Sequence, residues 1–461
     1  MQKKKTNDEA IVNAGVHAYT AEEKYVRPED PAVQKGVEAF MDRKLGLMMH
    51  WMPGAQLSSF ESWPLSDGDA AWSQSDVDWT DIPHFKEQYI NANRTFYPYR
   101  FRPDKMASFA KDCGFRYLLF TTKHHDGFCM FDTKTTDYKV TGRACPYHDA
   151  ENADVTEALF DAFRNEGMAI HCYFSKPDWH SKYYWSPEFP PAETRNPNYD
   201  PAEHPEIWDK YVEEVHTQLR ELMNDYGDIA CLWLDGGWVR PENHQDLHLE
   251  ELVEEFRNGP QPGLVVCDRT VGGPLENVVT PEKTVPEEYL GIPWETCTTL
   301  GEKFSFHYTD HFKTPEETVH LFLDIVAKGG CLALNVAPKP DGELPEGAML
   351  TMRDLGRFMR VFGDAIYGTR ALAPYVIRKW RYLQKDGRYF AFYLYSGFPR
   401  LANRLYISCP ETVEPEAIKG VKALRTGEEL PFTTEEEYIV LNTENFSLRD
   451  ALYAEGFELL V

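Results

Sequence analysis

Carboxylates and an arginine follow short apolar runs at several places in this chain. Asp235 ends the run "LWLD" and precedes two glycines, so its carboxylate can face a cavity without crowding from its own backbone. Arg269 follows the run "VVCD", where a buried arginine needs a carboxylate or a ligand oxygen. Glu282, Glu287 and Glu288 lie in the next loop, and Glu295 lies in "PWETC". We therefore expect at least two carboxylates from separate strand ends to face one cleft.

Two carboxylates in one cleft provide the chemistry of glycoside hydrolysis. One attacks the anomeric carbon, and the other protonates the leaving oxygen and then activates water. Trp233 and Trp238 would flank Asp235, and tryptophan beside a carboxylate is common at sugar sites and also in cores. An aspartate at a strand end also suits a turn or a helix N-cap, so the motif alone leaves both interpretations open.

Histidines follow other apolar runs. His50 follows "GLMM", His124 and His125 follow "LLFTTK", and His171 and His180 flank "CYFSKPDW". Neutral imidazoles suit sugar hydroxyls, but histidines and carboxylates on strand ends also build metal sites. Adjacent residues of a strand point to opposite faces, so we do not expect His124 and His125 to bind one ion unless the strand has already ended before them. A metal-dependent hydrolase and a glycan-binding protein without activity remain alternatives.

The segments that must position these side chains alternate between strand-like and helical patterns. Apolar runs typical of parallel strands buried on both faces lie at 44–51, 117–126, 168–179, 229–238, 263–270, 293–299 and 330–338. Helical patterns lie between them and end at glycines, and Thr314, Pro315 and Glu317 form the signature of a helix start. The alternation predicts an α/β barrel or an open doubly wound sheet. Polar clusters at the carboxyl ends of the runs favour the barrel.

The remaining composition excludes several kinds of partner. A net charge of -26 disfavours nucleic acids and anionic membranes. The first residues, "MQKKKTNDEAIVNAG", lack the apolar region of a secretory signal, and no run of 18 apolar residues predicts a membrane span. The 9 cysteines form no C-x-x-C pair. These features predict reduced cysteines and a cytoplasmic location.

Several motifs together resemble glycoside hydrolase family 29, the retaining α-L-fucosidases. The resemblance is carried by "GLMMHW", "KHHDGF" and "LWLDGGW", with support from "CDRT", "WETCTT" and "LALNVAPKPDGELPEGAM". It implies a TIM-like (β/α)8 barrel followed by an antiparallel β-sandwich, and double displacement through a covalent glycosyl-aspartate without metal or cofactor. Short strand-like runs after residue 370 also predict a sandwich. We expect an N-terminal extension at 1–35, the catalytic barrel at 36–368 and the sandwich at 369–461.

The resemblance also implies roles for individual residues. Asp235 occupies the position of the family's nucleophile. The acid/base varies in position within the family; we assign it to Glu282, with Glu295 as the alternative. The residues expected to bind the sugar are His50, Glu61, Trp63, His124, His125, Tyr173, Trp233, Arg269 and Glu295.

The chain departs from the family pattern at the border of the expected pocket. It has "ESW" for an "EW" pair, "SFHY" for "SWGY" and "CDR" for "NDR". We expect an exo-α-L-fucosidase that acts on a fucosylated oligosaccharide or glycoconjugate. An α-L-galactosidase with the same mechanism is the alternative, because an apolar pocket rejects an added hydroxyl only weakly. We expect no nucleic-acid or membrane partner, and a homo-oligomer remains open.

Overall fold

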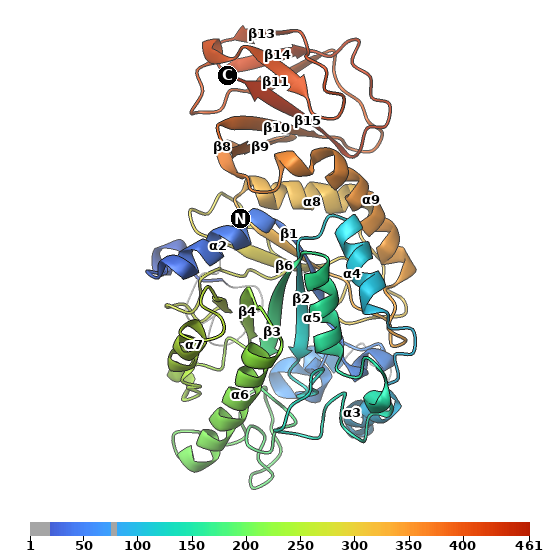
Figure 1. Cartoon of the computed structure of the whole chain (residues 1–461), viewed down its shortest axis with the longest axis vertical. Coiled ribbons are helices and arrows are strands. Elements are labelled where there is room, and N and C mark those ends of the chain that lie inside the picture. The colour runs from blue at the N-terminus through green and yellow to red at the C-terminus, as the bar shows by residue number, and fades with distance from the viewer. Residues whose placement is uncertain (1–18, 75–80) are drawn as a thin grey trace.

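A seven-stranded parallel sheet forms the centre of the larger part of the molecule. The computed structural model describes residues 19–74 and 81–461 (Figure 1). The strands follow the order β5-β4-β3-β2-β1-β7-β6, and every neighbouring pair is parallel. Their bounds are β1 Leu45–Met49, β2 Tyr117–Lys123, β3 Ala169–Ser175, β4 Cys231–Asp235, β5 Val265–Asp268, β6 Glu295–Thr299 and β7 Cys331–Asn335.

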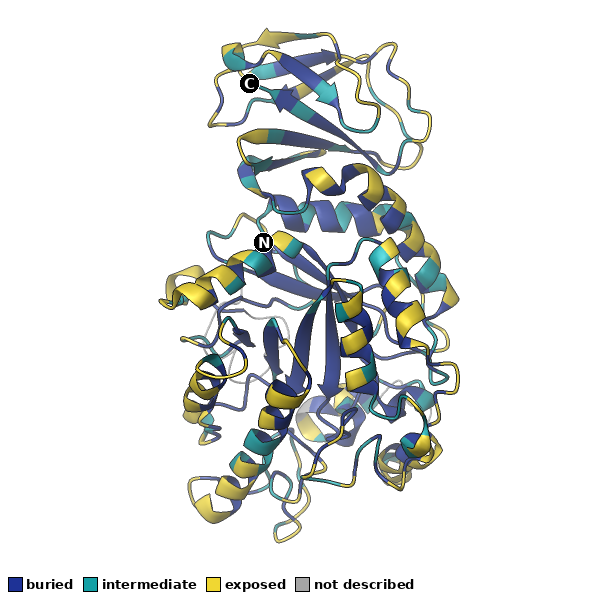
Figure 2. Cartoon of the chain, in the orientation of Figure 1, coloured by how far each residue is buried: buried dark blue, intermediate teal, exposed yellow. Residues whose placement is uncertain are grey.

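Helices cover the outside of this sheet. Their bounds are α2 Pro31–Arg43, α3 Ile82–Asn91, α4 Pro103–Asp112, α5 Val155–Asn165, α6 Pro205–Asp225, α7 Leu249–Arg257, α8 Pro315–Ala327 and α9 Glu346–Phe362. Apart from α3, which packs on the short helices beyond the strand ends, they turn buried faces inward and exposed faces outward (Figure 2). The predicted start of α8 is confirmed, because the Thr314 hydroxyl accepts from the Glu317 amide while the Glu317 carboxylate accepts from the Thr314 amide. Among the described residues the strands of this sheet therefore alternate with helices as the sequence predicts, except between β5 and β6, where no helix intervenes.

The sheet differs from the predicted closed barrel of eight strands, because it is open between β5 and β6. An irregular segment, 276–282, occupies this position. Within this segment, Glu276 forms an isolated bridge with β5. Val279 pairs with the residue just before β6, and Glu282 pairs with β6 itself. Pro281 within this segment has no N–H group to donate, although its carbonyl accepts from the Cys297 amide. The segment nevertheless brings Glu282 to the same sheet edge as the ends of the strands.

Two antiparallel sheets form the C-terminal part, as the sequence predicts. The first has the order β12-β15-β10-β9-β8 and the second has the order β11-β14-β13. Their bounds are β8 Arg370–Ile377, β9 Trp380–Lys385, β10 Arg388–Leu394, β11 Arg404–Ser408, β12 Gly420–Ala423, β13 Phe432–Glu435, β14 Tyr438–Asn442 and β15 Ala454–Leu460. One apolar cluster joins residues of both sheets, including Tyr382, Ile407, Ile439 and Phe457.

The predicted division into three parts stays a prediction. Residues 1–18 of the expected N-terminal extension lie outside the described residues, and its expected end at residue 35 falls within α2. Among the residues that the structure describes, no helix combines the length and apolar character that crossing a bilayer requires. The cytoplasmic location and the oligomeric state also remain predictions.

Close packing at Gly46 generates a stability prediction. A Cβ at this position of β1 would overlap the ring of Tyr117 on β2, and both residues are buried in the sheet. We expect Gly46→Ala to lower the free energy of unfolding by about 3 kcal/mol, because an overfilled core must shift. Urea denaturation followed by fluorescence measures this. The matched control is Gly263→Ala, whose Cβ would meet its nearest atom at 3.5 Å. Equal stability of the two variants would contradict the packing described for β1 and β2.

Candidate active site

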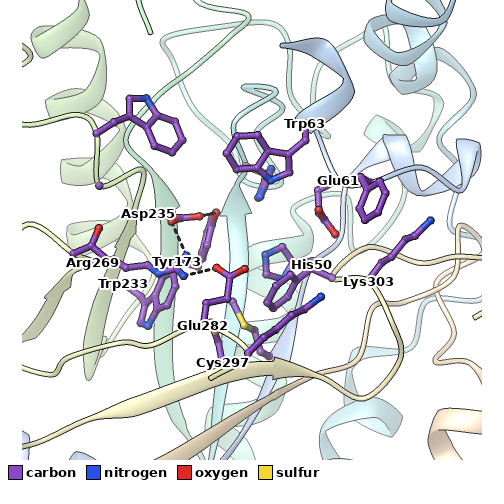
Figure 3. A pocket seen from close by; sticks show the side chains of 18 of the residues that line it. His50, Glu61, Trp63, Tyr173, Trp233, Asp235, Arg269, Glu282, Cys297 and Lys303 are labelled. Carbon is purple, nitrogen blue, oxygen red and sulfur yellow. Dashed lines mark hydrogen bonds and ion pairs between the residues drawn. The ribbon is translucent and has the colours of Figure 1, made fainter. Parts of the chain in front are cut away.

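A cavity of about 220 Å³ opens at the carboxyl edge of the parallel sheet (Figure 3). Strand ends supply its functional groups, because the side chains that follow each strand meet at this edge. Nine of the residues predicted for the site line the cavity: His50, Glu61, Trp63, His124, Tyr173, Trp233, Asp235, Arg269 and Glu282. His125 and Glu295 are the two predicted residues that do not line it.

Asp235 is the most strongly held carboxylate of the cavity. Its Oδ2 accepts a hydrogen bond from the Tyr173 hydroxyl at 2.6 Å. Its Oδ1 accepts from Arg269 Nη1 at 3.1 Å and from the amide of Gly236 at 2.9 Å. Burial alone would raise the pKa of Asp235, but Arg269, His125 and Tyr173 together hold it well below its ordinary value. Asp235 is therefore an ionised and oriented carboxylate.

Arg269 links Asp235 to Glu282. While Nη1 binds Asp235, Nη2 donates to Glu282 Oε2, and both contacts are drawn in Figure 3. The side chains of all three residues are mostly shielded from solvent. Burial opposes the charge of the guanidinium, yet the two carboxylates raise the pKa of Arg269 above its ordinary value. One cation thus holds two carboxylates from different parts of the chain in the same pocket.

His50 presents a hydrogen-bond acceptor toward the cavity. Asn335 Oδ1 accepts a hydrogen bond from the His50 amide at 3.2 Å. Asn335 Nδ2 donates to the Phe304 carbonyl at 2.8 Å, which fixes which end of the amide is the oxygen. The same Oδ1 lies 2.9 Å from His50 Nδ1, so Nδ1 carries the proton. Burial lowers the pKa of His50 to about 4, so the ring is neutral at neutral pH. The unprotonated Nε2 can then accept a hydrogen bond from a ligand hydroxyl.

The side chains of His124 and His125 lie beyond the end of their strand and close to one another. Strand β2 ends at Lys123, so both histidines lie in the following turn and their rings lie 4.3 Å apart. Ligand atoms of His124, His125 and Asp235 lie within 4.8 Å of one another, a grouping that could hold a metal ion. The strand has therefore ended before both histidines, which is the condition under which they can converge on one point.

Serine hydroxyls hold the two histidine rings. Ser62 Oγ lies 2.6 Å from His124 Nδ1, and Ser175 Oγ lies 2.7 Å from His125 Nδ1. Burial lowers the pKa of His124 well below its ordinary value and lowers that of His125 to about 4. Both rings are neutral at neutral pH. His124 contacts the cavity directly, whereas His125 lies behind it, with Nε2 3.7 Å from Asp235 Oδ2.

Aromatic rings and a buried glutamate form the rest of the wall. Trp63 packs edge-on against His125 and tilted against Trp238, which also lines the cavity. Glu61 accepts from the Ser305 amide at 2.8 Å, and burial raises the pKa of its carboxyl above the ordinary value. The "ESW" and "SFHY" motifs therefore meet in space at the pocket.

Glu295 lies away from the cavity. It is the first residue of β6, so its side chain sits deeper in the sheet than those that follow the strands. Its carboxylate accepts hydrogen bonds from the Tyr117 hydroxyl and, at 3.2 Å, from Trp233 Nε1. Burial raises the pKa of Glu295 to about 7. Of the two glutamates, Glu282 faces the cavity and Glu295 does not.

Sequence reasoning missed several residues of the cavity. Phe60, Trp72, Lys303 and Phe304 line it; Trp72 lies in a 3-10 helix, Gly68–Gln74, and the other three lie in loops without a strand pattern beside them. The "SFHY" motif next to Phe304 was the available signal. His171 and His180 are not among the lining residues; His171 stacks between two aromatic rings of the core, and His180 stacks on Tyr138.

A parallel α/β sheet with two carboxylates on one arginine, in a sugar-sized pocket walled by tryptophan and neutral histidine, defines a glycoside hydrolase. A family model described as Alpha-L-fucosidase matches residues 12–364. The chain therefore belongs to the alpha-L-fucosidase family.

Individual relatives agree with this assignment. A putative alpha-L-fucosidase of Caenorhabditis elegans is 25% identical over 351 residues, which cover 71% of this chain and 66% of that protein. The chain thus spans about two thirds of that relative. The structure of alpha-L-fucosidase isoenzyme 1 from Paenibacillus thiaminolyticus has a TM-score of 0.75 at 27% identity and covers 93% of this chain and 99% of its own. An alpha-fucosidase from Thermotoga maritima, bound to a mechanism-based inhibitor, shares the fold with a TM-score of 0.73 at 24% identity, over 95% of this chain and 100% of its own.

The buried carboxyl of Glu295 generates a pH-dependent stability prediction. Because its folded pKa of about 7 lies above the ordinary 4.5, its contribution to stability falls as pH rises through this interval. Glu295→Gln does not titrate, so its stability relative to the natural chain should increase from pH 5 to pH 8 by up to about 3 kcal/mol. Denaturant titrations at both pH values measure this, with Glu203→Gln at an exposed position as control. A difference that is the same at both pH values would contradict the assignment.

Proposed function

We propose that this chain is a retaining exo-α-L-fucosidase that removes terminal α-L-fucose from oligosaccharides or glycoconjugates. The observation that carries the proposal is the pair of carboxylates, Asp235 and Glu282, bound to one guanidinium in a small pocket. Membership of the alpha-L-fucosidase family supports the choice of sugar. The neutral His50 and His124 supply partners for sugar hydroxyls.

In the first step, Asp235 is the nucleophile. Its ionised carboxylate attacks the anomeric carbon, the bond from that carbon to the leaving oxygen breaks, and Glu282 gives its proton to the leaving oxygen. Glu282 can deliver this proton when its carboxyl faces the glycosidic oxygen rather than Arg269. Tyr173 and Arg269 hold the carboxylate of Asp235 in place for the attack.

In the second step, water replaces the aspartate. Glu282 takes a proton from the water, the water oxygen bonds to the anomeric carbon, and the ester to Asp235 breaks. Asp235 leaves as an ionised carboxylate that Arg269 and Tyr173 again stabilise. The net result is hydrolysis with retention at the anomeric carbon.

The choice between fucose and L-galactose depends on one hydroxyl group. The cavity wall includes the apolar side chains of Met48, Phe60 and Phe304 beside Cys297. These suit the methyl group of fucose, while an apolar wall rejects an added hydroxyl by only about 1–3 kcal/mol. We therefore propose α-L-galactosides as slower substrates of the same site.

Replacing Asp235 tests the nucleophile. Asp235→Gly should lower kcat for 4-nitrophenyl α-L-fucoside by more than about 10³-fold, because the covalent route is lost. Azide or formate should partly restore release, since a small anion fits the vacated space and attacks the sugar. The control is Asp161→Ala, at an exposed position of α5.

Three outcomes would contradict the proposal. The first is full activity of Asp235→Gly. The second is loss of wild-type activity in EDTA that zinc restores, which would favour a metal-dependent hydrolase at His124, His125 and Asp235. The third is the absence of glycoside release by the wild type, which would favour a glycan-binding protein.

Replacing Glu282 tests the acid/base. Glu282→Ala should lower kcat for a fucosylated oligosaccharide by about 10²–10⁴-fold, because a poor leaving group needs the proton. The loss should be smaller for 4-nitrophenyl α-L-fucoside, whose leaving group departs without protonation. Glu288→Ala, at an exposed position of the same loop, is the control and should behave as the wild type. Wild-type kinetics of Glu282→Ala on the oligosaccharide would overturn this assignment.

A further inference from the structure

Glu295 is a fully buried carboxylate that lies between two strands beneath the pocket. It begins β6 and is 0% exposed. Its two oxygens accept from donors on other strands, Oε2 from the Tyr117 hydroxyl on β2 and Oε1 from Trp233 Nε1 on β4. A buried charge-bearing group is costly, so its retention beside an apolar core points to a specific task.

Trp233 connects this carboxylate to the catalytic groups. The Tyr173 ring stacks on the indole with centroids 5.3 Å apart and an angle of 20° between the planes. The guanidinium of Arg269 lies 5.4 Å from the centroid of the same indole. Tyr173 and Arg269 are the two side chains that hold the carboxylate of Asp235. The indole therefore supports both side chains that orient the nucleophile, and its N–H group is bound by Glu295.

We propose that Glu295 is a positioning residue that fixes the Trp233 indole, so that Tyr173 and Arg269 hold Asp235 in line for attack. The inference rests on the proposed glycosidase function, and it assigns Glu295 a role that differs from proton transfer. Small displacements of a nucleophile are costly to catalysis, because attack requires close and aligned atoms. Loss of the anchor should therefore reduce kcat more than it changes substrate binding.

The hydrogen-bond chemistry predicts which substitutions can replace Glu295. An indole N–H group can only donate, so its partner must be an acceptor. The amide oxygen of glutamine can accept from Trp233, and its NH₂ group can donate to the Tyr117 oxygen. The Tyr117 hydroxyl can then turn to the Leu332 carbonyl, which lies 3.3 Å away. Leucine has a similar size but offers no acceptor, so it leaves the N–H group of Trp233 unpaired.

The first experiment compares three variants with 4-nitrophenyl α-L-fucoside and a fucosylated oligosaccharide. Glu295→Leu should lower kcat by about 10–100-fold with KM changed by less than about threefold. Glu295→Gln should keep at least about a third of the wild-type kcat on both substrates, with an unchanged pH profile and no stimulation by azide. Tyr117→Phe removes the other donor but leaves Trp233 bound, and it should also keep most of the activity. Thermal melting of each variant reports whether it folds.

The second experiment is a double-mutant cycle with Trp233→Phe, whose ring cannot donate to Glu295. If Glu295 acts through Trp233, then Glu295→Leu should lower kcat further by less than about threefold in the Trp233→Phe background. A loss as large as in the natural background would overturn the inference. If the leucine variants do not fold, the kcat and pH profile of Glu295→Gln test the inference, and a large loss of kcat in that variant would overturn it.

Two further outcomes can be told apart from a failure of the double-mutant cycle. If Glu295→Gln loses as much activity as an acid/base variant and azide restores it, Glu295 transfers a proton. That result would overturn the positioning role. A wild-type chain that releases no nitrophenol would instead contradict the proposed function. If the wild type is active but the effects of Glu295→Leu and Trp233→Phe on kcat are additive, only the role of Glu295 is contradicted.

Discussion

One guanidinium lies between two partly buried carboxylates, and the arrangement of the active centre depends on it. Asp235 and Glu282 would repel one another in this partly buried pocket, since like charges interact more strongly there than in bulk water. Arg269 binds each of them through a different nitrogen and offsets that repulsion. Removing one partner from such a buried cluster typically costs about 3–5 kcal/mol. Arg269 therefore allows the two carboxylates of the proposed mechanism to share one cavity before a sugar arrives.

The parallel sheet makes this convergence possible. Asp235 ends β4, Arg269 follows β5, and Glu282 ends the irregular segment beside β6. Side chains from other parts of the chain hold both carboxylates, because Tyr173 of β3 and Arg269 bind Asp235 and Arg269 also binds Glu282, which limits their movement. The histidines complete the pocket as neutral groups, because burial disfavours their charged forms. They are therefore suited to holding hydroxyl groups rather than to transferring protons.

Much of this organisation could be predicted from the sequence, because apolar strands and polar strand ends leave a local pattern. The seven parallel strands, the capped start of α8 and the cavity positions of Asp235 and Arg269 follow from such patterns. Glu282 was one of several candidate glutamates by sequence, and its choice as the acid/base came from the family resemblance. Three features could not be predicted from the sequence, because they depend on tertiary geometry. The opening between β5 and β6 results from an irregular segment, the convergence of His124 and His125 from a turn, and the burial of Glu295 from its place at the start rather than the end of β6.

The central claim is that Asp235, held by Arg269 and Tyr173, forms the covalent bond to the sugar. The most direct measurement is to trap that bond with 2-fluoro-fucosyl fluoride, digest the protein and locate the added mass by tandem mass spectrometry. The account predicts one fluorofucosyl group per chain, attached to Asp235 in the peptide that contains "LWLDGGW". A label on Glu282, Glu295 or any other residue, or turnover without a trapped ester, would contradict it.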